Sequence, residues 1–185
     1  WVWPPKKRDH GIHHVKMDSF SQQTEYFLRH QSLPEFNVKK EYREKALEWM
    51  GRMGCEKKLC GAVHLKFIPG VAGESNFNNS AWCQFFKDTL LEDENDFIIV
   101  GEDPLDRGVL NFPNLHFTCD DKLPLAVQLA LIQKADFFMG MASGFCQMAI
   151  FGIKPYAIFK NPGHHKEEMA REKILDQRLP FSVSG

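Results

Sequence analysis

Short apolar runs alternate with amphipathic stretches along this chain from about residue 58 onward, and most runs end at glycine, proline or acidic residues. A continuous apolar run such as residues 97–100 is typical of a strand that is buried on both faces of a sheet. Apolar residues three and four positions apart, as in residues 80–91, predict a helix with one buried face. The pattern predicts strands at residues 59–65, 97–100, 115–118, 136–141 and 156–159, and helices at residues 80–91, 123–134, 145–151 and 164–175.

Residues 1–56 differ in composition from the rest of the chain, because they are polar and rich in charged and aromatic residues. The pattern predicts one helix over residues 18–30 and a second over residues 38–53, which ends at Gly54. We therefore expect a helical N-terminal segment at residues 1–56 and a separate domain at residues 57–185. We interpret the segment as a remnant of an upstream domain, or as a linker to one.

The order of the predicted elements sets the fold class. Strands that alternate with helices favour a parallel sheet whose crossover connections place helices on its faces. We predict an α/β fold, a Rossmann-like doubly wound parallel sheet with helices on both faces, preceded by the helical N-terminal segment. About 125 residues are a normal size for one such domain.

Composition and charge narrow the class of protein. The chain has 185 residues, 43% of them hydrophobic, and a formal net charge of −1, so charge gives no reason to expect nucleic acid as a partner. No run is long enough for a transmembrane helix and no secretory signal opens the chain. Five scattered cysteines without a C-x-x-C pair favour reduced thiols, a cytoplasmic protein and no structural zinc. The chain begins at Trp1 rather than Met, so we interpret it as a fragment of a longer protein.

Polar and glycine-rich residues follow each predicted strand, where open α/β sheets bind their ligands. Lysines for phosphate charge, carboxylates for ribose or sugar hydroxyls, and free amides in glycine turns are typical of a nucleotide or nucleotide-sugar site. We expect no metal and no cofactor. The candidate binding residues are Lys66, Gly73, Glu74, Ser75, Asn76, Glu102, Asp103, Asp120, Ser143, Gly144, Lys160 and His164.

The segment at residues 136–151 is the most informative of these. It predicts a strand, a turn at Ser143 and Gly144, and a short apolar helix. Free N–H groups and the positive end of a helix dipole meet in such a turn and suit a phosphate. The alternative is a buried strand–helix unit without a ligand. Ser143 lacks the G-x-S-x-G pattern of a hydrolase nucleophile, so a phosphate anchor is the preferred interpretation.

His64 alternates with apolar neighbours inside the first predicted strand. Such a histidine is either a core residue bonded to a neighbour or a catalytic group, and the pattern leaves both open. The loop at residues 70–76 matches neither G-x-G-x-x-G nor a P-loop. No catalytic base is evident in the sequence.

Two motifs resemble the carboxy-terminal, donor-binding half of GT-B fold glycosyltransferases, closest to heptosyltransferase-like and fucosyltransferase-like members. Residues 63–66, Val-His-Leu-Lys, are similar to a His-x-Arg segment that ends the first strand of the donor domain, with Lys66 in place of the arginine that contacts the donor diphosphate. Residues 135–144 resemble the strand and Ser-Gly turn that hold the donor phosphates. The resemblance covers roughly residues 58–165 and implies a nucleotide-sugar donor and an unidentified acceptor.

We therefore predict a glycosyltransferase donor-binding domain, in which Lys66 and the amides near Ser143 and Gly144 hold the leaving diphosphate. Glu102 or Asp103 would bind ribose or base hydroxyls. The alternatives are a non-catalytic nucleotide- or sugar-binding module, a sugar-nucleotide epimerase of related fold, and a purely structural interaction domain. The donor sugar, its base and the oligomeric state do not follow from the sequence.

Overall fold

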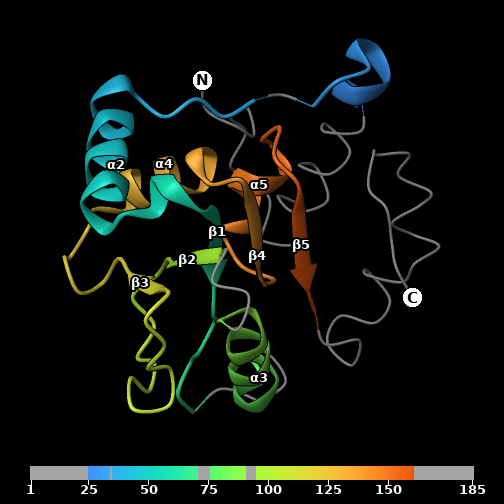
Figure 1. Ribbon diagram of the computed structural model, residues 1–185. Helices are drawn as coiled ribbons and strands as arrows, with labels where there is room; N and C mark the ends of the chain where they lie inside the picture. The colour runs from blue at the N-terminus through green and yellow to red at the C-terminus, as the bar shows by residue number, and fades with distance from the viewer. Residues whose placement is uncertain (1–24, 34, 71–75, 91–94, 161–185) are drawn as a thin grey trace. The chain divides into compact units, whose positions relative to one another are not determined.

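The computed structural model describes residues 25–33, 35–70, 76–90 and 95–160 (Figure 1). The chain divides into two compact units, one of which runs from Phe36 to His164. Of the other unit, the described part contains a helical turn over residues 25–30, with an ion pair between Glu25 and Arg29 at 2.9 Å. All further elements among the described residues belong to the unit from Phe36 to His164.

In the described residues, five parallel strands form one sheet. They are β1 (Leu59–His64), β2 (Asn95–Ile99), β3 (Leu115–Phe117), β4 (Phe137–Met141) and β5 (Tyr156–Phe159). Their order across the sheet is β3-β2-β1-β4-β5. The chain moves outward from β1 to β3 and then crosses to β4 on the other side of β1, which is the doubly wound arrangement of a Rossmann-like sheet. The predicted fold class is confirmed.

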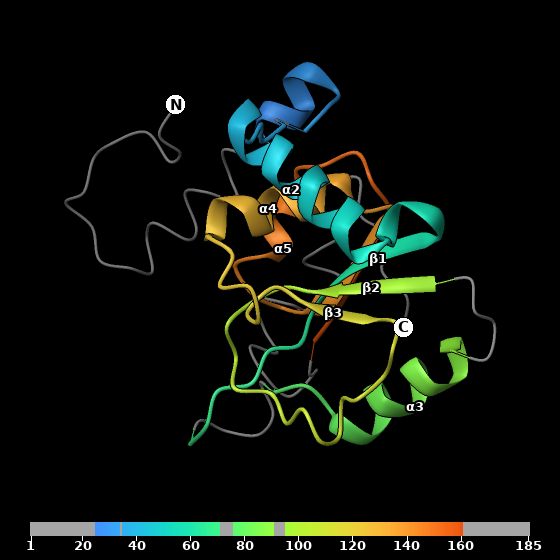
Figure 2. The same ribbon diagram turned by 60° about the vertical axis from the view of Figure 1, so that its left-hand side comes forward.

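Helices cover both faces of the sheet (Figure 2). Three of them, α2 (Lys40–Met53), α4 (Leu125–Lys134) and α5 (Cys146–Ile150), share a core with residues such as Ala62, Ile98 and Phe138. Helix α3 (Asn79–Leu90) covers the other face, where Trp82 and Phe86 pack against Phe97 and Ile99. Alternate side chains of each buried strand thus enter different cores, which explains the continuous apolar runs in the sequence.

Helix α2 is part of the same core as the sheet. Trp49 is 2% exposed, and its indole N–H donates to Asp121 at 2.6 Å, in the loop that follows β3. The helix ends at Gly54, whose φ of 78° is the left-handed conformation expected of a glycine stop. A short 3₁₀ turn, η1 (Cys55–Lys57), then leads into β1. The predicted division between residues 56 and 57 falls between α2 and β1, whereas the compact unit begins at Phe36.

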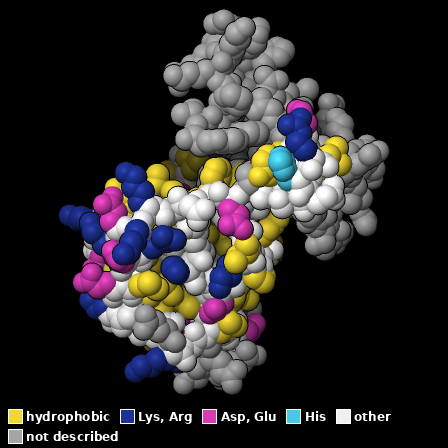
Figure 3. Space-filling model, turned by 90° about the horizontal axis from the view of Figure 1, so that it is seen from above, with side chains coloured by type: hydrophobic (Ala, Val, Ile, Leu, Met, Phe, Trp, Pro, Cys, Tyr) yellow, Lys and Arg dark blue, Asp and Glu magenta, His cyan; other side chains and the backbone are white. Residues whose placement is uncertain are grey.

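The predicted bounds of these elements agree with the structure to within two residues. The helix predicted at residues 164–175 and the start of the one at residues 18–30 lie outside the described residues. On the face seen in Figure 3, Lys and Arg side chains are interspersed with Asp and Glu, in line with the net charge of −1. Among the described residues, we find no helix long and apolar enough to cross a membrane.

Candidate functional site

The order of the strands reverses between β1 and β4, and a crevice at the carboxyl ends of such strands is where doubly wound sheets bind ligands. At this point His64 of β1 pairs with Gly140 of β4, and the two backbones lie close together. A Cβ atom on Gly140 would lie 2.7 Å from the backbone oxygen of His64. Only glycine therefore allows this approach of the two strand ends.

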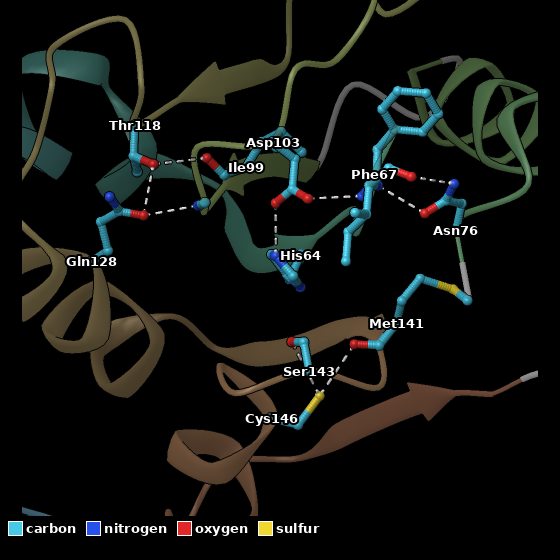
Figure 4. Close-up of polar contacts among 12 residues, drawn as sticks. His64, Phe67, Asn76, Ile99, Asp103, Thr118, Gln128, Met141, Ser143 and Cys146 are labelled. Carbon is cyan, nitrogen blue, oxygen red and sulfur yellow. Dashed lines mark hydrogen bonds and ion pairs between the residues drawn. The ribbon is translucent and has the colours of Figure 1, made fainter. Parts of the chain in front are cut away.

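His64, which is buried, pairs with the partly buried Asp103 at the end of β1 (Figure 4). The Nε2 atom of His64 lies 3.2 Å from Asp103 Oδ2, and the other carboxylate oxygen accepts the N–H of Phe67 at 2.8 Å. His64 is 4% exposed, and its ring lies 4.7 Å from that of Phe145. Asp103 therefore fixes both the imidazole ring of His64 and the backbone that follows β1.

Burial determines the charge of His64. It lowers the pKa of the imidazole below its ordinary value of 6.5, although Asp103 acts in the opposite direction. The Nδ1 atom is buried and has no partner among the described residues. With Nε2–H donated to Asp103, Nδ1 is left as a buried hydrogen-bond acceptor at the end of β1.

The turn at residues 142–145 joins β4 to α5. Within the described part of the chain, the backbone N–H groups of Gly144 and Phe145 have no hydrogen-bond partner, and Gly144 faces open space. The N–H of Ser143 faces the Cys146 sulfur and acts to lower the pKa of that thiol. The Cys146 thiol donates to the carbonyl of Met141 at 3.3 Å and closes the turn. Because α5 is only five residues long, the free N–H groups contribute more to attracting an anion than the dipole of the helix does.

Lys66 lies two residues beyond His64 and is partly exposed. Its positive charge helps to lower the pKa of His64. It also opposes the effect of burial, which raises the pKa of the Cys146 thiol. Lys66, Asp103, Ser143 and Gly144 follow the carboxyl ends of β1, β2 and β4, which are neighbouring strands of the sheet.

A cavity of about 610 Å³ lies at the same edge of the sheet, on the side of α3. Asn76 lines it, but both polar atoms of its side-chain amide bond to the backbone of Ile68 and close the loop after β1. Lys160, at the end of β5, also lines the cavity. The remaining lining is mainly apolar, from Phe77, Ala81, Trp82, Phe85, Met139, Met141 and Phe159, with Asn78.

Other predicted binding residues lie elsewhere. Asp120 follows the edge strand β3, two strands away from β1, and pairs with Arg107, whose guanidinium carbon lies 3.2 Å from the centre of the Phe117 ring. Glu102 is exposed beside Asp103. Gly73, Glu74, Ser75 and His164 lie outside the described residues, so they stay predictions.

The sequence pattern missed a buried polar cluster centred on Gln128 of α4. Its amide oxygen accepts the N–H of Gly101 at 2.8 Å and the hydroxyl of Thr118 at 3.2 Å (Figure 4). Its NH₂ donates to the carbonyl of Leu123. These hydrogen bonds join α4 to the loops that follow β2 and β3. They therefore stabilise the loop after β2, which carries Asp103. In the sequence, this cluster was indicated by a glutamine on the apolar face of a predicted helix.

Asp136, the acidic residue of the second motif, lies at the opposite end of β4. Its carboxylate accepts the N–H of Cys60 at 2.9 Å, and its own N–H donates to the carbonyl of Cys60. It therefore fixes the pairing of β1 with β4. Among the described residues, no group of three or more His, Cys, Asp or Glu is arranged to hold a metal ion.

An open parallel sheet with this strand order and helices on both faces belongs to the Rossmann-like class of α/β folds. The structure is similar to that of the glycosyl transferase family 9 from Veillonella parvula DSM 2008, with a TM-score of 0.52 and 13% sequence identity over 77% of this chain. The chain spans 46% of that protein. At this identity the likeness shows a shared fold. No protein-family model and no curated protein matches the sequence.

The buried His64 and the partly buried His116 are expected to give opposite dependences of stability on pH. The lowered pKa of His64 means that the unfolded state binds more protons, so the free energy of unfolding falls as the pH drops below 6.5. His116 has a raised pKa, mainly from Cys55, so its contribution is present at low pH and is lost as the pH rises above 6.5.

Urea unfolding between pH 5 and 8 measures both effects. His64→Gln should remove the loss of stability on the acidic side, and His116→Gln should remove the loss on the alkaline side. The same pH profile in wild type and in His64→Gln would contradict the assignment of a neutral His64.

Proposed function

We propose that this chain is the donor-binding part of a glycosyltransferase that uses a nucleoside diphosphate sugar. The observation that carries the proposal is that Lys66 and two backbone N–H groups without a partner among the described residues, those of Gly144 and Phe145, follow the ends of the paired strands β1 and β4, at the switch point of the sheet. A diphosphate requires this combination of a cation and several donors. The fold shared with a family 9 glycosyl transferase structure supports the same class.

In this proposal the protein stabilises the diphosphate as it leaves the anomeric carbon of the sugar. Lys66 neutralises the developing charge, and the N–H groups of the turn at residues 142–145 donate to the phosphate oxygens. Because these donors are fixed by the backbone before the substrate binds, they need little rearrangement during the reaction. The part of the enzyme that binds the acceptor, and with it the catalytic base, would belong to chain beyond this donor-binding part.

The cavity beside α3 provides room for the rest of the donor. Its mixture of aromatic, methionine and asparagine side chains suits the faces of a sugar or a base together with a few hydroxyls. Lys160 contributes a cation to the lining at the end of β5. We therefore place the diphosphate at the crevice between β1 and β4, and one end of the donor in the cavity.

Lys66→Ala is expected to weaken binding of the preferred nucleoside diphosphate by about tenfold to a hundredfold, because hydrogen bonds to charged groups contribute about 1.5–3 kcal/mol. Lys66→Arg should retain most of the affinity, since it keeps the charge and can bind phosphate with two N–H groups. Isothermal titration calorimetry with a panel of nucleoside diphosphates measures both variants against wild type.

Lys134→Ala is the matched control, because Lys134 is exposed at the end of α4, on the opposite edge of the sheet. It should bind like wild type. Absence of binding by any nucleoside diphosphate, with the circular dichroism of a folded protein, would overturn the proposal. Product analysis after incubation with a nucleotide sugar that binds then distinguishes a transferase from an epimerase. Transfer releases the diphosphate, whereas epimerisation keeps it attached to the sugar.

A further inference from the structure

The cavity beside α3 adjoins the proposed diphosphate position. Its volume of about 610 Å³ lies within the range of roughly 300–1,000 Å³ that is usual for small-molecule sites. Met141 and Phe159, which both line it, are register partners in the neighbouring strands β4 and β5. Met141 is the last residue of β4, so the turn at residues 142–145 begins at one wall of the cavity. A ligand held by that turn can therefore extend into the cavity.

Three aromatic side chains of the lining meet edge to face. The ring centre of Trp82 lies 5.7 Å from that of Phe85 and 5.5 Å from that of Phe159, at interplanar angles of 85° and 89°. Trp82 is buried and Phe85 is partly buried, whereas Phe159 is 42% exposed. Phe159 is therefore the ring of the three that a ligand can reach most readily.

Hydrogen bonds within the protein determine what the polar side chains of the lining can offer a ligand. The amide of Asn76 uses both its oxygen and its NH₂ on the backbone of Ile68. The Oδ1 atom of Asn78 accepts the N–H of Ala81 at 3.1 Å, so the NH₂ donor is the other polar group of this side chain. Lys160 adds an ammonium group, which can only donate. In the part of the lining that the structure describes, no side-chain oxygen is therefore left without a hydrogen bond.

These properties distinguish the two ends of a nucleoside diphosphate sugar. Each hydroxyl of a sugar is a donor as well as an acceptor, and a buried donor without an acceptor costs free energy. A nucleobase is flat and stacks on aromatic rings, and every base carries ring nitrogens or carbonyls that accept hydrogen bonds. A lining of aromatic rings and donors therefore suits a base better than a sugar.

We propose that Phe159 is the base-stacking residue of the donor site, and that the site selects the donor by the ring size of its base. The inference rests on the proposed function, which places the diphosphate beside the cavity. Since every base offers acceptors to the same donors, hydrogen bonds here discriminate little between bases of equal size. Purines present a larger face for stacking than pyrimidines and bind more tightly. The sugar then lies outside the cavity, where an acceptor can reach it.

Isothermal titration calorimetry of the chain with ADP, GDP, UDP, CDP and inorganic pyrophosphate tests the inference. ADP and GDP are expected to bind about threefold to tenfold more tightly than UDP and CDP, with less than about threefold between the members of each pair. All four should bind at least roughly tenfold more tightly than pyrophosphate, which lacks a base. This comparison needs no variant, so it decides the matter even where a substitution prevents folding.

Phe159→Leu is expected to weaken ADP binding roughly tenfold, because it keeps an apolar side chain but removes the stacking face. Phe159→Tyr keeps the flat ring and should bind ADP like wild type. Leu59→Ala is the control, since Leu59 is 50% exposed at the start of β1, on the opposite edge of the sheet, and it should also bind like wild type. None of the three substitutions should change the affinity for pyrophosphate.

Tighter binding of UDP or CDP than of ADP and GDP would overturn selection by ring size. Equal affinity for pyrophosphate and ADP, or an equal loss for both ligands in Phe159→Leu, would show that the base does not lie on Phe159, while the diphosphate site would stand. Absence of binding by all five ligands would instead overturn the proposed function and this inference with it.

Discussion

Phe86→Ala is expected to lower the free energy of unfolding by about 3–5 kcal/mol, the range for loss of a fully buried aromatic side chain. Phe86 is 0% exposed and belongs to α3. Its ring centre lies 5.3 Å from that of Phe97 in β2 and 5.6 Å from that of Trp82. The substitution therefore leaves a cavity at the centre of the contact between α3 and the sheet. Urea unfolding followed by circular dichroism measures the change.

The same substitution should weaken ligand binding, because Trp82 and Phe85 of α3 line the cavity beside the crevice. Ile153→Ala is the control, since this apolar side chain is 82% exposed and its loss should change stability by less than about 0.5 kcal/mol. A loss of less than about 1 kcal/mol in Phe86→Ala would show that α3 does not pack as described.

Gly140→Ala is expected to cost about 2–3 kcal/mol of stability, at the upper end of the range for overpacking. The new methyl group would lie 2.7 Å from the backbone oxygen of His64 and 3.1 Å from its Cβ. A backbone oxygen in a paired strand moves much less easily than the end of a side chain, so β1 and β4 must separate. Because the crevice lies between these strands, we also expect diphosphate binding to fall at least tenfold, in parallel with the loss of stability.

Gly144→Ala is the matched control in the same segment. No atom lies within 4 Å of the added methyl group. The free energy of unfolding should therefore change little. Any change in diphosphate affinity in this variant would then come from the methyl group beside the proposed phosphate position and not from a loss of stability. Equal losses of stability in both variants would contradict the close approach of β1 and β4.

The strands and helices could be predicted from local pattern alone. Runs such as residues 97–100 are continuous because both faces of the sheet are covered, and the switch to helical spacing marks each crossover. The carboxyl-edge position of Lys66, Ser143 and Gly144 followed from the same reasoning, since parallel strands end at one edge. The pairing order of the strands could not be predicted from local pattern, because it depends on contacts between residues far apart in the chain.

The interpretation of His64 shows the limit of local pattern. A histidine among apolar neighbours was consistent with a core residue or a functional one. The structure shows it buried, with Nε2 3.2 Å from Asp103 and, among the described residues, no partner for Nδ1. Asp103 is 39 residues away along the chain, so no local signal joins the two. In the same way, nothing in the sequence near Asp120 indicated its pairing with Arg107 across the edge of β3.

By itself, the sequence determined the class of fold and the edge of the sheet where polar groups collect, because strand burial and strand ends are properties of neighbouring residues. The tertiary structure decided which of those groups meet. It put the strand that precedes Lys66 beside the strand that precedes the turn at residues 142–145, placed Asp120 after an edge strand, and put Cys60, Asp96 and His116 on one face of the sheet. The physical reason is that strand order and register, rather than distance along the chain, set which side chains share a face.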